Sequence, residues 1–349
     1  MNLDLFKDIL SIDSTTGKER ELALWLHEHL EAPSKQFMEV GDGTLNLLLC
    51  WGTPEVVFCT HMDTVPPYLP VRFEEGAAPG MTPLNEVSTV WGRGACDAKG
   101  QIIAMYTACK ELDASGASGF GLLLLAGEET CSWGAKAFAK TGFKAPFLIV
   151  GEPTENKMVS ASKGTKSYDL RFQGKAFHSG YPEYGVSAVE LFNEFCNKLS
   201  AMDFGEDPIL GKTTWNIGLL HSENPQNILS PELTCCIYFR TTFVSDEKVE
   251  AFMQGITGTS TVVTARGGDK PARYVVLPGF ESGPVAFGSD APHLGNFGHK
   301  IICGPGSIRF AHRDDEHIDL PDVEKAIGLY KSMYAALHQA SNPATQLPD

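Results

Sequence analysis

Carboxylate and imidazole side chains stand directly after three strongly apolar runs of this sequence. They are His61 and Asp63 after the run at 56–60, Glu128 and Glu129 after 122–127, and Glu152 after 147–151. The active sites of open α/β sheets lie at the carboxyl ends of their strands, so we expect these groups to gather at one sheet edge. Imidazole nitrogens and carboxylate oxygens are ligands of Zn²⁺, and the pattern therefore predicts a site for one or two metal ions.

The spacing of His61 and Asp63 suits a ligand and its supporting carboxylate. One residue separates them, so on an extended strand both side chains point to the same face. A carboxylate beside an imidazole can accept its second N–H and fix the tautomer that binds metal. Taken alone, the pair favours a surface contact at a strand end, and only the surrounding pattern favours the metal site.

Asp97 lies in the glycine-rich segment 92–100, Gly-Arg-Gly-Ala-Cys-Asp-Ala-Lys-Gly. Glycine lets the backbone approach a ligand closely, and one carboxylate can bridge two cations with its two oxygens. Asp is also a favoured N-cap residue, and a helix is expected to begin at residue 99. Both roles fit the sequence.

Glu128 and Glu129 are adjacent, and two such negative charges are costly to hold together without a cation. One carboxylate of such a pair can bind metal while the other stays free, with a raised pKa, to carry protons. The alternative is a solvated acidic loop, which the preceding apolar residues disfavour.

Three further histidines are weaker candidates. The charged segment 311–317 holds His312 and His317, either of which could be the last ligand, and an ordinary charged loop is the alternative. His178 lies in a stretch where a structural histidine is the default interpretation.

Composition limits the kind of partner. The chain has 349 residues, which favours two domains, and 43 acidic against 28 basic residues give a net charge of -15. Such a surface repels nucleic acid and anionic membranes. No apolar stretch approaches the ~20 residues of a membrane span, and the N-terminus lacks a signal-peptide pattern. Nine cysteines without a Cys-x-x-Cys pair predict free thiols and a cytoplasmic location.

Helical and strand-like segments alternate through most of the chain. Helices are expected at 3–12, 18–31, 99–113, 133–141 and 321–339, and strands at 45–50, 56–60, 87–91, 121–126 and 147–150. This alternation predicts an α/β domain whose central sheet, largely parallel or mixed, is covered by helices.

The pattern changes near residue 162. Strands are expected at 165–173, 213–220, 232–242 and 260–265, with helices at 185–201 and 245–254. The order β-α-β-β-α-β is the split βαβ unit of ferredoxin-like α+β domains. We therefore predict a discontinuous catalytic domain, residues 1–162 and 270–349, with an inserted domain at 163–269.

Five segments together resemble the zinc-dependent amidohydrolase and metallopeptidase family of acetylornithine deacetylase, succinyl-diaminopimelate desuccinylase, aminoacylase and related carboxypeptidases. They are Thr-His-Met-Asp-Thr-Val-Pro at 60–66, Gly-Ala-Cys-Asp-Ala-Lys-Gly at 94–100, Gly-Glu-Glu-Thr at 127–130, Gly-Glu-Pro-Thr at 151–154, and Gly-Pro-Gly at 304–306 ahead of His312. The resemblance covers nearly the whole chain in the family order, and it implies a zinc-aminopeptidase-like catalytic domain.

The resemblance implies a role for each residue of the predicted site. His61 and Glu152 would bind one zinc ion, Glu129 and His312 the other, and Asp97 would bridge them. Co or Mn are possible substitutes. Asp63 would orient His61, and Glu128 would be the general base and acid acting on a metal-bridging water. The Asp97–Ala98 peptide is expected to be cis.

The inserted domain resembles the family's lid or dimerisation domain, which implies a homodimer. His178 would stabilise the oxyanion, from the partner subunit in relatives, and Arg240 suits a bidentate contact with a substrate carboxylate. Asn227 and Ser289 are further substrate-binding candidates. Family members commonly show Asn-x-x-Pro, whereas here three residues separate Asn227 from Pro231, one more than in that motif.

The sequence thus predicts a cytoplasmic metallohydrolase that cleaves the amide of a small N-acyl amino acid, in the manner of acetylornithine deacetylase. Within the same chemistry, a succinyl-diaminopimelate desuccinylase, a dipeptidase or a carboxypeptidase remains open. A non-catalytic metal- or peptide-binding protein on the same fold is the alternative of a different class.

Overall fold

The structure is a computed structural model that describes residues 1–41, 43–73 and 88–340. The chain divides into two compact units. The first comprises residues 1–160, 274–283 and 289–349, and the second comprises 161–273 and 284–288. The second unit is thus an insertion in the sequence of the first.

A six-stranded mixed sheet forms the centre of the first unit. Its strands are β1 (Ser34–Gly41), β2 (Thr44–Trp51), β3 (Val56–His61), β6 (Phe120–Leu125), β7 (Ala145–Val150) and β17 (Phe297–Ile302), in the spatial order β1-β2-β6-β3-β7-β17. The run from β6 through β3 and β7 to β17 is parallel, whereas β1 and β2 pair antiparallel at the other side. Strand β3 is buried along its whole length, as expected of a central parallel strand.

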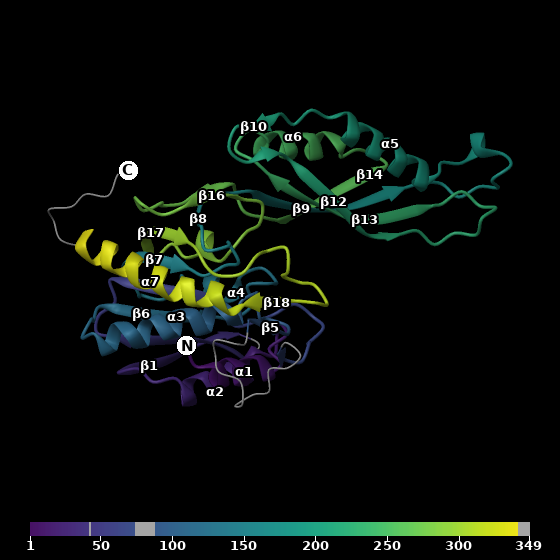
Figure 1. Ribbon diagram of the computed structural model, residues 1–349. Helices are drawn as coiled ribbons and strands as arrows, with labels where there is room; N and C mark the ends of the chain where they lie inside the picture. The colour runs from purple at the N-terminus through teal and green to yellow at the C-terminus, as the bar shows by residue number, and fades with distance from the viewer. Residues whose placement is uncertain (42, 74–87, 341–349) are drawn as a thin grey trace. The chain divides into compact units, whose positions relative to one another are not determined.

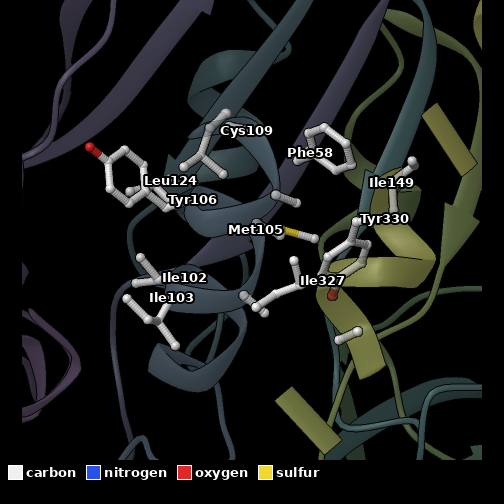
Figure 2. Close-up of a cluster of buried hydrophobic side chains, with 14 of the residues drawn as sticks. Phe58, Ile102, Ile103, Met105, Tyr106, Cys109, Leu124, Ile149, Ile327 and Tyr330 are labelled. Atoms are coloured by element: carbon white, nitrogen blue, oxygen red, sulfur yellow. The ribbon is translucent and has the colours of Figure 1, made fainter. Parts of the chain in front are cut away.

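Helices cover this sheet. They are α1 (Leu3–Ser11), α2 (Glu19–His29), α3 (Lys99–Ala114), α4 (Trp133–Phe138) and α7 (Leu320–Ala340), with a short 3₁₀ turn, η3, at Ala291–His293. Helices α3 and α7 pack against each other and onto β3 (Figure 1). Figure 2 shows Met105 of α3 among Phe58, Ile327 and Tyr330, so that strand β3 and both helices share one apolar core.

Two small sheets complete the first unit and its connections. Strands β4 (Arg72–Phe73), β5 (Thr89–Trp91) and β18 (His317–Asp319) form one, in the order β18-β5-β4. Strands β8 (Met158–Ser162), β15 (Ala272–Arg273) and β16 (Ser282–Val285) form the other, where the chain passes from one unit to the next. Because β18 pairs antiparallel with β5, residues just before β18 lie beside residues just after β5.

The second unit is a four-stranded antiparallel sheet with two helices over one face (Figure 1). Its strands are β9 (Gly164–Gln173), β12 (Thr214–His221), β13 (Glu232–Thr241) and β14 (Thr261–Gly267), and its helices are α5 (Ala188–Ala201) and α6 (Asp246–Ile256). A 3₁₀ turn, η2 (Pro182–Tyr184), and a two-stranded ribbon of β10 (Glu206–Asp207) and β11 (Gly211–Lys212) complete it. The spatial order β12-β13-β9-β14 is that of the split βαβ arrangement.

The predicted fold class, a mixed α/β domain with an additional α+β module, is confirmed. Three details differ from the expected elements. Strand β1 was not predicted, and helix α4 ends at Phe138 rather than 141. Helix α5 begins at Ala188 rather than 185, because Val186 is extended and pairs with Lys175. Residue 87, the first of the expected strand 87–91, lies outside the described residues. No helix in the described part of the chain is both long and apolar enough to cross a membrane.

Candidate metal centre

Parallel pairing brings three of the predicted segments to one edge of the central sheet. His61 is the last residue of β3, and the strands on both sides of it, β6 and β7, run in the same direction. Glu128 and Glu129 follow β6 within four residues, and Glu152 follows β7 within two. The side chains therefore leave the sheet at the edge where the sequence predicted them.

Asp97 lies between two histidines. Its Oδ1 is 3.0 Å from Nε2 of His61, and its Oδ2 is 3.3 Å from Nε2 of His312. Nε2 of His312 is also 3.0 Å from Oε1 of Glu129. The ligand atoms of His61, Asp97 and Glu129 all lie within 4.8 Å of one another. The two oxygens of one carboxylate thus face two different imidazoles, as a bridging ligand requires.

The donor set fits metal cations. Nδ1 of His61 is 2.9 Å from the backbone carbonyl of Asp63, which can only accept, so Nδ1 carries the proton. Nε2 then presents a lone pair to the Asp97 carboxylate at 3.0 Å, and a second proton or a metal ion must lie between them. Without metal, hydrogen bonds with Asp97 and Glu129 raise the pKa of His312 to about 10. A cation in place of those protons would likewise be attracted to the imidazole lone pairs and the carboxylates.

Burial alone would disfavour a charged His61, but hydrogen bonds with Asp63 and Asp97 outweigh it and raise its pKa well above the usual value. The pKa of Asp97 falls below its usual value, because its hydrogen bonds with His312 and His61 outweigh desolvation. Each of these shifts reflects the attraction between imidazole and carboxylate in a site with little access to water.

Glu128 and Glu152 are the two acids of the centre whose carboxyl groups have no hydrogen-bond or ion-pair partner among the residues the structure describes. Desolvation is the largest cause of a pKa well above the usual range for both, and repulsion from neighbouring carboxylates adds to it. Asp97 is near enough to contribute to this repulsion at each. A carboxyl with a raised pKa beside the ligand cluster is suited to hold and release a proton.

Asp63 does more than contact His61. Its Oδ1 is 3.4 Å from Nδ1 of the imidazole, and its two oxygens accept hydrogen bonds from the backbone N–H groups of Glu128, at 3.0 Å, and Glu129, at 3.1 Å. The Thr16 hydroxyl donates to the same carboxylate at 2.9 Å. Asp63 therefore ties the end of β3 to the loop that carries both glutamates.

The loop after β6 is also fixed from β2. The Asn46 side chain accepts from the N–H of Ala126 and donates to the carbonyl of Gly134, so it spans the two ends of this loop. Gly127 has a φ of +70°, and a Cβ there would collide with the Trp133 indole at 1.7 Å. Only glycine fits at the point where the chain turns toward Glu128.

Four acidic or polar residues around the centre were missed by the sequence analysis. Asn46, Glu19, Asp290 and Glu316 are all fully or almost fully buried. Burial raises the pKa of Glu19 to about 7 and that of Asp290 to about 6. One signal could have revealed Glu316, since it lies four residues after His312 in the same segment.

Other expectations for the first unit were resolved in detail. The Asp97–Ala98 peptide is cis, as the resemblance predicts. Asp97 does not cap helix α3, whose N-cap position is Ala98. The His317 ring lies against the rings of Trp91 and Phe310, tilted to both, and is not part of the cluster. The Ser289 hydroxyl accepts from the N–H of Ala291 at 3.3 Å and so supports the turn η3.

The remaining predicted residues belong to the second unit, and the centre described above contains no residue from it. His178 is exposed in a turn, and its Nδ1 accepts from the N–H of Gly180 at 3.1 Å. Asn227 lies in the loop between β12 and β13, where its backbone carbonyl accepts a hydrogen bond from the N–H of Ser179. Arg240 lies on β13 with its guanidinium 5.0 Å from the centre of the Tyr238 ring.

A sequence model of the family described as peptidase family M20/M25/M40 matches residues 57–336. A peptidase M20 domain-containing protein of Schizosaccharomyces pombe is 31% identical over 346 residues, which cover 95% of this chain and 83% of that protein. A probable carboxypeptidase of Aspergillus oryzae is 32% identical over 316 residues, which cover 81% of this chain and 75% of that protein.

Two solved structures share the fold at low sequence identity. A tripeptidase from Staphylococcus aureus has a TM-score of 0.79 at 20% identity, covering 97% of this chain and 98% of its own. A dinuclear metal binding peptidase from Bacillus subtilis has a TM-score of 0.64 at 11% identity, covering 95% of this chain and 96% of its own. Both matches extend over the full architecture, insertion included.

Proposed function

The chain belongs to peptidase family M20/M25/M40, and from this premise we propose that it is a metal-dependent hydrolase that cleaves an amide bond in a small peptide or N-acyl amino acid. One observation carries the proposal. The Asp97 carboxylate lies between Nε2 of His61 and Nε2 of His312, beside the carboxyl of Glu128. That arrangement pairs a cation site with a group able to move protons.

We assign the metal ligands as the resemblance implies, with His61 and Glu152 for one ion, Glu129 and His312 for the other, and Asp97 between them. The dinuclear character of the Bacillus subtilis structure supports two ions, and zinc is the metal we propose. When bound, such ions polarise the carbonyl of an amide and lower the pKa of water, which makes hydrolysis feasible at neutral pH.

Glu128 is the proposed proton carrier. Its carboxylate takes a proton from the attacking water, and its carboxylic acid gives that proton to the departing amine. In the metal-free protein burial raises the pKa of Glu128, which favours a protonated carboxyl able to hold the proton between the two steps. Asp63 supports both steps by holding the backbone of Glu128 and Glu129.

The second unit is proposed to supply substrate contacts. His178 would donate to the developing oxyanion and Arg240 would bind a substrate carboxylate, with Asn227 as a further contact. Ser289, which belongs to the first unit, is the remaining proposed substrate contact. A homodimer through this unit is supported by apolar side chains exposed on the edge strand β12, among them Leu219 at 76% and Leu220 at 56%. A cytoplasmic location remains a proposal that rests on the nine unpatterned cysteines.

Short peptides with a free carboxylate are the substrate class we favour, because probable carboxypeptidases and a tripeptidase are among the similar proteins. Acetylornithine deacetylase-like turnover of an N-acetyl amino acid uses the same amide chemistry, as does removal of a succinyl group. Release of amine from dipeptides, tripeptides, N-acetyl and N-succinyl amino acids, each with Zn²⁺, Co²⁺ or Mn²⁺ added, separates these substrates.

Glu128→Gln tests the catalytic role. We expect turnover to fall by ~10²–10⁴-fold, since general acid–base catalysis contributes about that much, while the metal content of the purified protein stays the same. Glu28→Gln, on the exposed side of α2, is the matched control and should leave both unchanged. Equal turnover in Glu128→Gln and the parent would remove Glu128 from the mechanism. A parent protein that binds metal and hydrolyses no amide would support the non-catalytic alternative.

A further inference from the structure

Glu316 joins the two loops that carry Asp97 and His312, and nothing in the proposed mechanism uses it. We propose that Glu316, paired with Arg93, is the positioning residue of the metal centre, which fixes the spacing between Asp97 and His312 before any metal binds. The inference rests on the proposed function, because it assumes that these two residues are metal ligands.

The Glu316 carboxylate accepts four hydrogen bonds. Its Oε1 accepts from the backbone N–H groups of Gly94 at 2.9 Å, Asp97 at 3.1 Å and Cys96 at 3.2 Å. Its Oε2 accepts from Nη1 of Arg93 at 2.6 Å. One side chain therefore satisfies three amides of the segment that ends in Asp97, including the amide of Asp97 itself.

Arg93 closes the network on the other side. Its guanidinium also donates to the carbonyls of Arg313, next to His312, and Pro67, both at 3.1 Å. The Arg93 and Glu316 side chains are at most 1% exposed, so bulk water does not compete for their hydrogen bonds. The pair thus connects the residue after His312 to the residues before Asp97.

The backbone places Glu316 for this role. Strand β18 pairs with β5, and the N–H of Gly92 donates to the carbonyl of Glu316 at 3.0 Å. The Asp97 segment is closed as well, because the N–H groups of Lys99 and Gly100 donate to the carbonyl of Gly94. Only glycine fits at position 100, since a Cβ there would lie 2.3 Å from the carbonyl oxygen of Ala95.

A purely structural ion pair is the competing explanation. Buried ion pairs contribute little net stability, and apolar side chains of similar volume often replace them without loss. Apolar side chains could not accept hydrogen bonds from the N–H groups of Gly94, Cys96 and Asp97, for which Glu316 is the acceptor found in the described part of the chain. The geometry therefore points to positioning of Asp97 as the reason for a carboxylate at 316.

The test is metal binding by the metal-free protein, measured by competition with a chromophoric chelator for Zn²⁺ and Co²⁺. In Glu316→Gln the amide oxygen still accepts the backbone N–H groups, but its NH₂ group faces the Arg93 guanidinium, donor against donor. We expect ~10–100-fold weaker metal binding, the usual cost of losing a group that orients a ligand, with KM unchanged at saturating metal. The visible spectrum of the Co²⁺-loaded protein should change too.

Asp314→Asn is the matched control, because it removes the same charge from an exposed position two residues away. Its metal affinity should equal that of the parent. A Glu316→Gln protein that unfolds at a lower temperature but binds metal as tightly as the parent would overturn the proposal and leave a structural ion pair. A parent protein that binds no metal would instead contradict the proposed function.

Hydrogen exchange in the parent protein tests the same idea without a substitution. We expect the amides of Gly94, Cys96 and Asp97 to exchange slowly in the metal-free protein, as slowly as with metal bound. Fast exchange that becomes slow only on metal addition would mean that metal, not Glu316, orders the segment, and would overturn the proposal.

Discussion

The candidate site residues of the two units differ in burial, although His312 of the first unit is exposed. In the first unit, His61, Asp63 and Asp97 are buried and each has at least two polar neighbours within 3.4 Å. In the second, His178 and Asn227 are exposed on turns. The proposed metal ligands need fixed geometry, whereas the proposed substrate contacts must stay open to the substrate. The contrast predicts that substitutions in the first unit will reduce metal binding, whereas substitutions in the second will change kcat or KM and leave metal binding unchanged.

Asp97→Asn should give the largest effect, because it removes the charge shared by the two histidines. We expect metal content after dialysis to fall to near zero and turnover to fall by ~10³-fold or more, the scale of losing metal-assisted catalysis. Metal analysis and amide hydrolysis measure both. Asp113→Asn, exposed on helix α3, which begins two residues after Asp97, should change neither. A metal-replete, active Asp97→Asn protein would contradict the bridging role.

His178→Ala and Arg240→Ala should leave metal content unchanged, in contrast to Asp97→Asn. We expect kcat to fall by ~10²-fold for His178→Ala, the usual cost of losing one oxyanion donor. For Arg240→Ala we expect KM to rise by ~10-fold, because a charged hydrogen bond to the substrate is lost. Loss of metal from either variant would break the division between the two units.

Glu19 gives the smallest effect and tests the cost of burying acids around the centre. Its pKa is about 7 in the folded protein against 4.5 normally, so the folded state favours the protonated form. Its contribution to stability therefore declines as pH rises from about 4.5 to about 7 and is least favourable above that. One carboxyl oxygen has no hydrogen-bond partner among the described residues.

Glu19→Gln should accordingly raise the free energy of unfolding by about 1–3 kcal/mol at pH 8 and leave it nearly unchanged at pH 4. Urea unfolding of the metal-free protein at the two pH values measures this difference. The exposed Glu21→Gln should show no such pH dependence. A gain at pH 4 equal to that at pH 8 would rule out the titration of Glu19 as its cause.

The sequence predicted the elements of the fold because their patterns are local. A run such as 122–127 identifies its own strand, and the carboxyl ends of parallel strands meet whatever lies between them in the chain. Strand β1 was missed because it is an edge strand with alternating exposure and no apolar run. Helix α4 was overextended because nothing in its sequence marks the end at Phe138.

The site was predictable as far as its residues follow strand ends. Glu129 and His61 were identified in this way, and the structure brings them together with Asp97 and His312. Asn46 could not be identified, because its partners are backbone groups far away in the sequence, and for Glu316 the nearness to His312 was the one available signal, since three of its four partners are backbone amides. Every residue has such groups, so no residue type marks them as partners.

The order of the cluster along the chain has a consequence for biosynthesis. His61, Asp97 and Glu129 precede the inserted unit, whereas His312 and Glu316 follow it. A nascent polypeptide can therefore complete its central strands and the whole insertion before His312 and Glu316 join the cluster. Until the ribosome has released residue 316, His61, Asp97 and Glu129 lack the contacts with His312 and Glu316 that complete the cluster.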